Sequence, residues 1–319
     1  MSAPLWAGLL LELRRRPDHS ATVRTLARSL STTPSSIENE LDALRERGYE
    51  VAGDGRGRLV LSIDSRLCAE EIQAAVHGHL VNRRIHVLDE VTSTQDVARR
   101  HAGQTDAGGL VFFAEHQTAG HGRFGRSWQS PSGRNLLFSV VLRFPHQPAD
   151  PSLVTVTASV AVCEALFESM NLPVQIKWPN DVLLADRKVA GVLVEQTRPR
   201  RRAPAYLVGI GLNVNAAPDL PEAISLAEFV HRPVDRTLVA CELLDRLETW
   251  YRRADAGESD DIVEHWRRHS STLGRRITLM SAGRRYTGRV LDMDLVHGLS
   301  IQTDTASILT FRPEKATLL

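Results

Sequence analysis

A stretch rich in glycine and arginine, between Glu115 and Asn135, has the residue types of a phosphate-binding loop. Its glycines alternate with basic side chains, in the order Gly120, His121, Gly122, Arg123, Gly125 and Arg126. Glycine lets backbone N–H groups approach an anion closely, and arginine reaches it with a forked guanidinium group. The spacing matches neither the Walker pattern nor the dinucleotide fingerprint, because an apolar strand follows it and not a helix. On this pattern alone, a site for a phosphate-bearing ligand and a flexible surface loop fit equally well.

Lysine is rare in this chain, and one lysine stands where a strand is expected to end. Of the 39 basic residues only three are lysines, namely Lys177, Lys188 and Lys315. A compact ammonium and a planar guanidinium do different work, so a lysine kept among so many arginines is a candidate catalytic charge. Strand alternation places Lys177 on the opposite face from Ile176, and the turn formed by 179–181 follows directly.

A short polar segment, Thr92–Asp96, precedes an expected helix. Ser93 or Thr94 would cap the N-terminus of this helix by accepting a backbone N–H. The same hydroxyls, with the amide of Gln95, could instead bind a polar, uncharged ligand group through directional hydrogen bonds. Both interpretations stay open at this point.

Apolar runs and alternating patterns predict the sheet and the helices that must position these residues. We expect strands at 85–88, 109–114, 136–142, 174–177, 181–185, 189–195 and 205–215. We expect helices at 152–170, 237–251 and 259–269. His265 and His269 in the last helix have ligand spacing, but no third ligand is near in the sequence, so no metal site is predicted.

The first 64 residues predict a winged helix-turn-helix. Helices are expected at 5–16, 22–30 and from Pro34 to about Gly48, and strands at 49–52 and 58–63. Candidate DNA contacts are Thr33, Ser35, Ser36 and Asn39 at the start of the third helix, with Arg56 and Arg58 in the wing. Residues 1–63 carry nine arginines against eight acids, and the third helix is acidic, so a docking or dimerisation module is the alternative.

The rest of the composition narrows the class of protein. At 319 residues and net charge +1, the chain is long enough for two or three domains and has no general demand for a nucleic-acid or membrane partner. Three scattered cysteines and no secretory or membrane-spanning run predict a cytoplasmic protein with free thiols. Strands at 277–279, 288–291 and 299–303 predict a small C-terminal β-barrel.

Five motifs together resemble those of the bifunctional biotin protein ligases that are also biotin operon repressors. They are Thr92–Gln95, Ala114–Trp128, Lys177–Asp181, Lys188–Glu195 and Val208–Asn215, in family order. The resemblance implies an α+β multidomain chain: a winged helix-turn-helix at 1–64, a helical linker at 65–84, a catalytic domain at 85–270 and an SH3-like domain at 271–319. It also implies that the catalytic domain has a class II synthetase-like mixed β-sheet.

The resemblance implies a biotin–acetyl-CoA-carboxylase ligase working in two steps. Biotin and MgATP give biotinyl-5′-AMP and pyrophosphate, and a lysine of biotin carboxyl carrier protein then attacks the mixed anhydride. Lys177 and Arg123 would be catalytic, since both can neutralise charge that develops on the α-phosphate. The implied partners are the carrier protein, operator DNA and a second copy of the chain.

The resemblance also assigns binding residues by motif position. For biotin they are Ser93, Thr94, Gln95, Gln117, His121, Gly122, Arg123, Lys177 and Gly191. Ser93, Thr94 and Gln117 are the positions for the ureido ring. For ATP and the adenylate they are Gly120, Arg123, Arg126, Trp128, Asn180, Lys188, Asn213 and Asn215.

Two departures from the family pattern stand out. His121 and Phe124 occupy loop positions where relatives often carry arginine, which leaves this loop less charged. The segment 216–229, expected to close on the adenylate, contains no tryptophan or tyrosine to stack on adenine, and its one aromatic side chain is Phe229. A lipoate-type acyl ligase and a repressor that only senses a ligand are the alternative functions.

Overall fold

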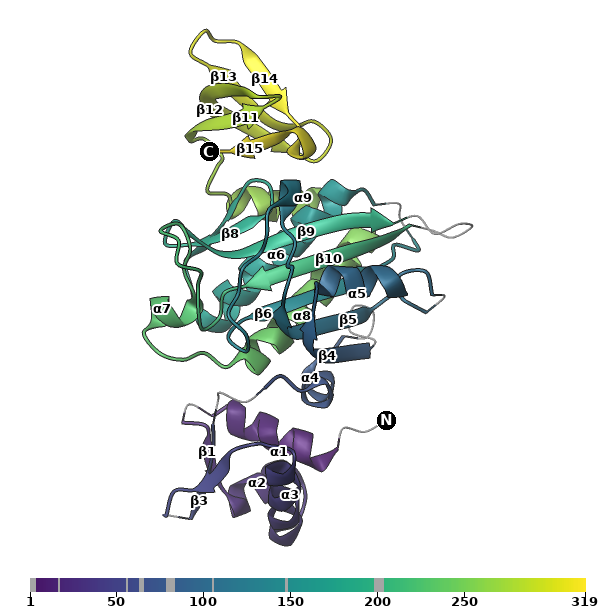
Figure 1. Ribbon diagram of the computed structural model, residues 1–319, viewed down its shortest axis with the longest axis vertical. Helices are drawn as coiled ribbons and strands as arrows, with labels where there is room; N and C mark the ends of the chain where they lie inside the picture. Colours follow the sequence, from purple (N-terminus) through teal and green to yellow (C-terminus); the bar gives the residue numbers. More distant parts are fainter. Residues whose placement is uncertain are drawn as a thin grey trace.

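The computed structural model is an elongated molecule of three units stacked along its long axis, with the N-terminal and C-terminal units at opposite ends of the larger middle unit (Figure 1). The structure describes residues 4–16, 18–55, 57–62, 66–78, 84–104, 106–146, 149–197 and 204–319.

The N-terminal unit packs three helices against a small antiparallel sheet in the order β1-β3-β2. Its elements are α1 (Leu5–Arg14), β1 (Ser20–Thr22), α2 (Val23–Ser29), α3 (Pro34–Glu46), β2 (Val51–Gly53) and β3 (Arg58–Leu61). Helix α3 begins as expected, because the Thr33 side chain accepts the Ser36 N–H and Pro34 occupies the first turn. Gly48 follows its end with a φ of 85°, a conformation that suits glycine. Strand β1 was not predicted.

The middle unit is built on a seven-stranded mixed sheet in the order β4-β5-β6-β10-β9-β8-β7. Only the β4–β5 pair is parallel among these neighbours. The strands are β4 (Arg84–Val91), β5 (Leu110–Gln117), β6 (Leu136–Leu142), β7 (Val174–Lys177), β8 (Asp181–Leu184), β9 (Arg187–Thr197) and β10 (Ala205–Leu212). Each strand expected in this region is present, although β5 runs three residues further than predicted, to Gln117, and β10 ends three residues earlier, at Leu212.

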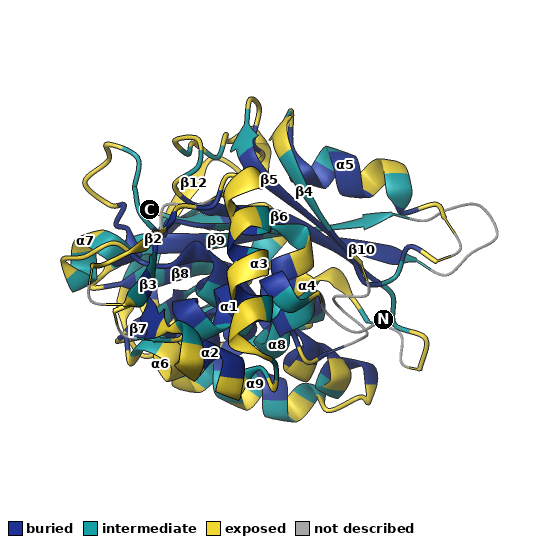
Figure 2. Ribbon diagram, turned by 90° about the horizontal axis from the view of Figure 1, so that it is seen from below, coloured by how far each residue is buried: buried dark blue, intermediate teal, exposed yellow. Residues whose placement is uncertain are grey.

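Helices cover both faces of this sheet. One face carries the main core, with α6 (Pro151–Met170) packed beside α8 (Arg236–Asp255) and α9 (Ser259–Arg268). The other face carries α5 (Thr94–His101), whose Val97 and Ala98 join a separate cluster. Helix α6 is long and apolar enough to cross a membrane, but most of it is buried inside the protein, which is typical of a core helix. Strands β5 and β10 of the sheet are mostly buried, as their dark blue colour shows (Figure 2).

A buried ion network joins the N-terminal unit to the middle unit. Arg14 lies at the end of α1. Its Nε is 2.5 Å from Oε1 of Glu71, and its Nη1 is 2.6 Å from Oδ2 of Asp235. Glu71 belongs to α4 (Ala69–Ala75), the helical part of the predicted linker, and Asp235 caps α8. All three side chains are almost inaccessible to solvent, so each charge depends on its partners.

The C-terminal unit is a five-stranded antiparallel sheet in the order β14-β13-β12-β11-β15. Its strands are β11 (Arg276–Ser281), β12 (Arg284–Asp294), β13 (Gly298–Thr303), β14 (Ile308–Phe311) and β15 (Ala316–Leu318), with a 3-10 turn, η2, at Pro313–Lys315. The first three strands were predicted. Strands β14 and β15 and the short helix α7 (Leu226–Val230) were not.

Candidate functional site

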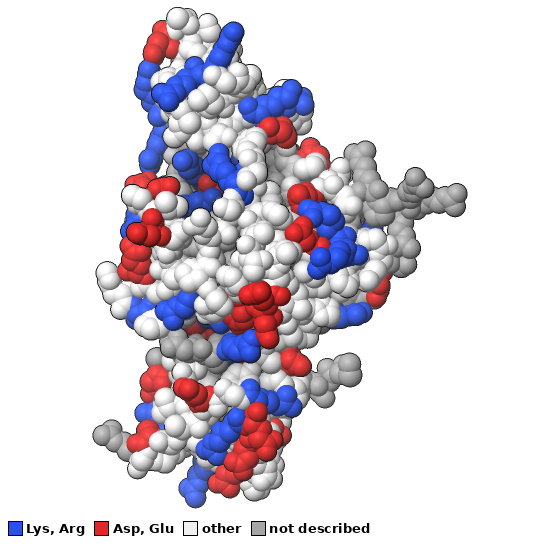
Figure 3. Space-filling view, viewed as in Figure 1, with Lys and Arg blue, Asp and Glu red and all other residues white. Residues whose placement is uncertain are grey.

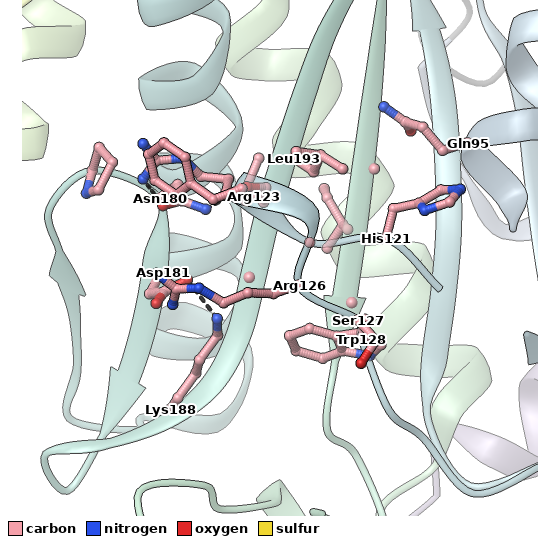
Figure 4. A pocket seen from close by; sticks show the side chains of 18 of the residues that line it. Gln95, His121, Arg123, Arg126, Ser127, Trp128, Asn180, Asp181, Lys188 and Leu193 are labelled. Atoms are coloured by element: carbon pink, nitrogen blue, oxygen red, sulfur yellow. Dashed lines mark hydrogen bonds and ion pairs between the residues drawn. The ribbon is translucent and has the colours of Figure 1, made fainter. Parts of the chain in front are cut away.

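A cavity of about 200 Å³ lies over β9 and β10, beneath the glycine-rich loop. Most of the site residues expected from the sequence line it (Figure 4). These are Ser93, Thr94, Gln95, Gln117, His121, Gly122, Arg123, Arg126, Trp128, Lys177, Asn180, Lys188 and Gly191. Strands far apart in sequence therefore bring the expected residues to one place. The structure also adds wall residues that were not expected, including Ser139, Thr317 and Leu318.

One end of the cavity is a network of buried hydroxyl and amide groups. The Thr94 hydroxyl lies 3.0 Å from Oε1 of Gln117 and 2.8 Å from the Ser139 hydroxyl. Ser139 in turn donates to Oε1 of Gln95 over 2.9 Å, and Gln95 donates to the Leu207 carbonyl. This end can hold a polar, uncharged group by directional hydrogen bonds.

Helix capping and ligand binding are compatible interpretations of this end. Ser93 is the N-cap of α5 and accepts the Gln95 N–H, while Thr94 is the first helical residue and faces the cavity. The Gln117 side-chain NH₂ has no partner within the described part of the chain, which leaves it free for a ligand. Ser139 could have been found from the sequence, because it is the one polar residue in the apolar run of 136–142.

Trp128 forms a wall of the cavity, and two glycines make room for its ring. A Cβ on Gly211 would lie 2.4 Å from the Trp128 ring, and one on Gly191 would lie 3.1 Å from it. The Lys188 ammonium is 5.4 Å from the ring centroid, within range of a cation–π contact. Gly191 and Gly211 are therefore required for the close approach of a side chain to the strands.

The opposite end of the cavity carries charge. Nζ of Lys188 lies 2.7 Å from Oδ1 of Asp181, and the Arg126 side chain extends toward the same carboxylate (Figure 4). Ile176 is fully buried in the core, whereas Lys177 lines the cavity, as the strand alternation predicted. Within the described ranges, the Lys177 ammonium has no hydrogen-bond or ion-pair partner. It is therefore free to bind an anionic ligand.

Arg123 ties three parts of the site together. It donates to Oδ1 of Asn180 over 3.0 Å and to the carbonyl of Pro313 in the C-terminal unit. Burial lowers the pKa of its guanidinium, while the nearby Asp181 and Glu314 carboxylates act to raise it. The next residue, Phe124, has a φ of 56° and an exposed ring 4.8 Å from that guanidinium. Arg123 thus fixes the closed end of the loop against the C-terminal unit.

His121 occupies the other loop position that departs from the family pattern. Its side chain is bound outside the charged end of the cavity. Its Nε2 lies 3.1 Å from Oδ2 of Asp96, which Arg99 also contacts. Burial acts to raise the pKa of Asp96, but the contacts with His121 and Arg99 outweigh burial and lower it. The His121 side chain is therefore held by α5 at the rim.

Three expected ligand residues do not line the cavity. Gly120 closes the base of the loop, where its carbonyl accepts the Trp128 N–H over 2.9 Å. The side-chain amide of Asn213 donates to the carbonyl of Ile224, and that of Asn215 both donates to and accepts from the backbone of Val234. These two amides bond to the backbone behind the cavity, although Oδ1 of Asn213 is buried without a partner in the described part of the chain.

The segment 216–229 offers no adenine platform in this structure. Phe229 is half-buried against the main core and does not line the cavity. The backbone at the start of the segment is held by Asn135, whose Oδ1 accepts the N–H groups of Val214, Asn215 and Ala216.

The expected DNA contacts differ in how free they are. Thr33, Ser35 and Asn39 are exposed and Ser36 is half-buried, and the Thr33 hydroxyl is hydrogen-bonded to the hydroxyls of both Ser35 and Ser36. Arg58 is engaged by Asp18 and Ser20 within its own unit, and Arg56 lies outside the described residues. Acidic and basic side chains lie side by side on the N-terminal unit, so the visible face of this unit is not uniformly basic (Figure 3).

The two histidines at ligand spacing and the three cysteines all lie in described parts of the chain. No group of three or more His, Cys, Asp or Glu side chains that could hold a metal ion occurs in the described ranges. Nδ1 of His265 lies 2.9 Å from the carbonyl of Asp261, one turn earlier in α9. All three cysteines are free thiols, as expected.

A mixed sheet that places hydroxyl and amide groups at one end of a cavity, and lysine and arginine at the other, defines an enzyme site for a polar molecule and an anion. Comparison with known proteins identifies the class. The model of the biotin/lipoate A/B protein ligase family matches residues 87–215. The chain belongs to this family, and its enzyme class is that of the biotin–acetyl-CoA-carboxylase ligases.

The similar proteins cover most of the chain. A biotin–acetyl-CoA-carboxylase ligase of Mycobacterium tuberculosis is 32% identical over 75% of this chain and 90% of its own length. The bifunctional ligase/repressor BirA of Bacillus subtilis is 28% identical over 86% of this chain and 87% of its own length. A biotin protein ligase from Aquifex aeolicus, solved with biotin and ATP, has a TM-score of 0.63 and 28% identity, covering 74% of this chain and 98% of the other.

Proposed function

We propose that this chain activates biotin as biotinyl-5′-AMP and then transfers the biotinyl group to a lysine of biotin carboxyl carrier protein. The observation that carries the proposal is a cavity with a hydrogen-bonding network at one end and Lys177 at the other, where its ammonium has no partner among the described residues. Joining a carboxylate to an α-phosphate needs both a site for the acid and positive charge where the two anions meet.

The polar end supports biotin in preference to lipoate. The ureido ring of biotin has two N–H donors and a carbonyl acceptor, and the hydroxyls of Thr94 and Ser139 with the free Gln117 amide can satisfy them. Ser93 and Gln95 complete this end of the cavity. The dithiolane ring of lipoate has no such groups, so it would leave the buried polar atoms unpaired.

The charged end would hold the reacting phosphate. Lys177 and Arg123 would neutralise the charge that builds up as the biotin carboxylate attacks the α-phosphate and pyrophosphate leaves. Arg126 and Lys188 line the same end, where Asp181 balances them. Magnesium would enter with the ATP phosphates as part of the substrate, because the described residues provide no dedicated cage.

The glycine-rich loop would act as a lid over the intermediate. A mixed anhydride hydrolyses readily, so a closed loop that excludes water favours transfer to the acceptor amine. Arg123 already joins this loop to Asn180 and to the C-terminal unit, which supports a closed arrangement in which the C-terminal unit takes part.

Exchange of labelled pyrophosphate into ATP tests this function directly. The wild-type protein should catalyse exchange with biotin present and little or none with lipoate or octanoate. Exchange that requires lipoate would identify a lipoate-type ligase. Absence of exchange with any acid, from protein that binds biotin, would mean that the larger unit only senses its ligand.

A second function, repression of transcription, is favoured by the N-terminal unit. Several relatives are named bifunctional ligase/repressor, and the three helices with a hairpin fit a winged helix-turn-helix. We propose that a homodimer in the cytoplasm binds a two-fold symmetric operator through Thr33, Ser35, Ser36 and Asn39. A mobility-shift titration with and without biotin and ATP tests it, and no specific complex at low salt would exclude it.

A further inference from the structure

A second cavity, of about 120 Å³, lies beyond Arg123 where the middle and C-terminal units meet. We infer that this cavity receives the ε-ammonium of the acceptor lysine and its four-carbon stem, and that Glu314 is the carboxylate that holds the ammonium. The inference rests on the proposed function, because it assigns the route of the second substrate to that reaction.

The second cavity adjoins the main cavity and shares part of its wall. Arg123, Trp178, Pro179 and Val192 are among the residues that line both. Arg123, held by Asn180 and by the Pro313 carbonyl, stands between them. The Arg123 side chain would therefore have to move for a group in the second cavity to reach the charged end of the first.

The walls of the second cavity suit an aliphatic stem. They include Val156 of α6, Val194 of β9, Trp266 of α9 and Leu295 of the C-terminal unit. Its volume is several times the roughly 10–15 Å³ that one water molecule requires. A lysine side chain buries its methylene stem against apolar surface while its charged end seeks a polar partner.

The charges at the cavity favour a cation over a phosphate. Glu314 and Asp294 line it, and its one lysine or arginine among the described residues is Arg123. Oδ1 of Asp294 is occupied, since it accepts the backbone N–H groups of Val296 and His297. Glu314 is exposed and makes no hydrogen bond or ion pair with another described residue. Its carboxylate acts electrostatically on the nearby Arg123 guanidinium and is still open to an ammonium group that enters the cavity.

Two tryptophans of the cavity wall provide a second observation that favours a binding site. Trp178 and Trp266 are each 2% exposed, and both line the cavity. The indole N–H of each has no acceptor within the described part of the chain. Buried indole N–H groups normally find a partner, and backbone carbonyls beside an acceptor lysine could provide one if the walls adjust on binding.

With Glu314 as the proton acceptor, every bond and proton of the transfer step is accounted for. The acceptor ammonium gives one proton to the Glu314 carboxylate, which passes it to solvent. The neutral amine attacks the acyl carbon of biotinyl-5′-AMP, the C–N bond forms, and the C–O bond to the phosphate breaks. AMP leaves with the electron pair, and the second N–H proton is released to solvent, so one amide, one AMP and two protons result.

The test compares nucleophiles of different charge on a Glu314→Lys variant. Preformed enzyme-bound biotinyl-5′-AMP would be mixed with the carrier domain, with propylamine, which is cationic at pH 7, or with hydroxylamine, which is neutral. The single-turnover rate constants for the carrier domain and propylamine should fall about tenfold relative to hydroxylamine, because an attraction is replaced by a repulsion. Asp260→Lys is the matched control, since Asp260 is also exposed and unpaired among the described residues.

A second variant tests the cavity without changing charge. Ser152→Trp would place a large ring in it from the first turn of α6, and should slow transfer to the carrier domain more than it slows pyrophosphate exchange. If Glu314→Lys lowers all three nucleophile rates equally or none of them, and Ser152→Trp lowers transfer no more than exchange, the assignment is wrong. Absence of exchange in the wild type would instead overturn the proposed function.

Discussion

Arg236 and Glu115 form a buried ion pair beneath the glycine-rich loop, with Nη1 of the arginine 2.7 Å from Oε2 of the glutamate. Arg236 is the first residue of α8, and Glu115 lies near the end of β5, where the loop begins. Nη1 of Arg236 also donates to the carbonyl of Asn135, where the loop ends. One side chain thus holds both ends of the loop against the helical layer.

Loss of this arginine should destabilise the whole protein. We expect Arg236→Met to lower the free energy of unfolding by about 3–5 kcal/mol, because it leaves the Glu115 carboxylate buried without its partner. Urea unfolding measures the change. The double variant Arg236→Met with Glu115→Gln should recover part of it, and a loss in Arg236→Met below about 1 kcal/mol would contradict the importance of the pair.

Replacement of Lys177 should abolish adenylate formation while the fold is kept. The side chain lines the cavity and has no partner among the described residues, so its loss removes a charge and leaves no buried group unpaired. We expect Lys177→Ala to lower the pyrophosphate exchange rate by about 10²–10³-fold. Lys177→Arg should fail too, because a planar fork does not replace a compact ammonium. The exposed Lys315→Ala is the control, and near wild-type exchange in Lys177→Ala would refute the role.

Arg123→Gly should release activated biotin. The substitution removes the contacts to Asn180 and to the Pro313 carbonyl and adds backbone freedom to the loop. We expect faster escape of biotinyl-5′-AMP and biotinylation of bystander proteins, measured by streptavidin blotting. Arg123→Lys keeps the charge but loses the two-pronged contact, so it should show intermediate leakage. Tight retention of the adenylate in Arg123→Gly would show that Arg123 does not secure the lid.

Gly211→Ala should impair the enzyme through Trp128. The new Cβ would lie 2.4 Å from Cε2 of the ring, so the ring must move into the cavity. Overpacking of this kind costs about 1–3 kcal/mol, and we expect a raised KM for biotin together with lower thermal stability. Gly103→Ala is the matched control, because nothing lies within 4 Å of its Cβ. Equal behaviour of the two variants would contradict the packing argument.

DNA binding, if the repressor proposal holds, should depend only weakly on salt. The exposed Glu38, Asp42 and Glu46 of α3 limit phosphate contacts, and Arg58 is already engaged by Asp18. The logarithm of the binding constant falls with the logarithm of the salt concentration, with a slope of about −0.9 for each neutralised phosphate. For the dimer we expect a slope closer to about −4 than to −10. Filter binding over a salt series measures it, and Glu38→Lys with Glu40→Lys should steepen the slope.

The sequence, together with the family resemblance, predicted many but not all of the residues that line the main cavity. The glycine-rich loop, the Lys177 turn and the polar start of α5 each stand next to an apolar strand or helix whose periodicity is clear. Their assembly into one cavity follows from strand pairing between β5, β6, β9 and β10. The resemblance to a family gave the roles, which periodicity does not.

The features that the sequence did not predict depend on contacts between segments that are far apart in the chain. Strand β1 has three residues and exists because it pairs with β3, and β15 brings Thr317 and Leu318 to the cavity by pairing with β11. Asn213 and Asn215 looked like ligand residues, but their partners, Ile224 and Val234, lie in a segment without a strong pattern. The Arg14 and Arg236 networks, likewise, could not be predicted from spacing.

The most direct test of the proposed function is a single-turnover experiment without acceptor. The protein would be incubated with biotin and ATP labelled at the α-phosphate, and the bound product would be separated and identified by mass spectrometry. We predict that label and biotin are retained together as biotinyl-5′-AMP, with release of pyrophosphate, and that added carrier domain discharges the complex to AMP and a biotinylated lysine. Release of ADP, or retention of biotin with no adenylate, would contradict it.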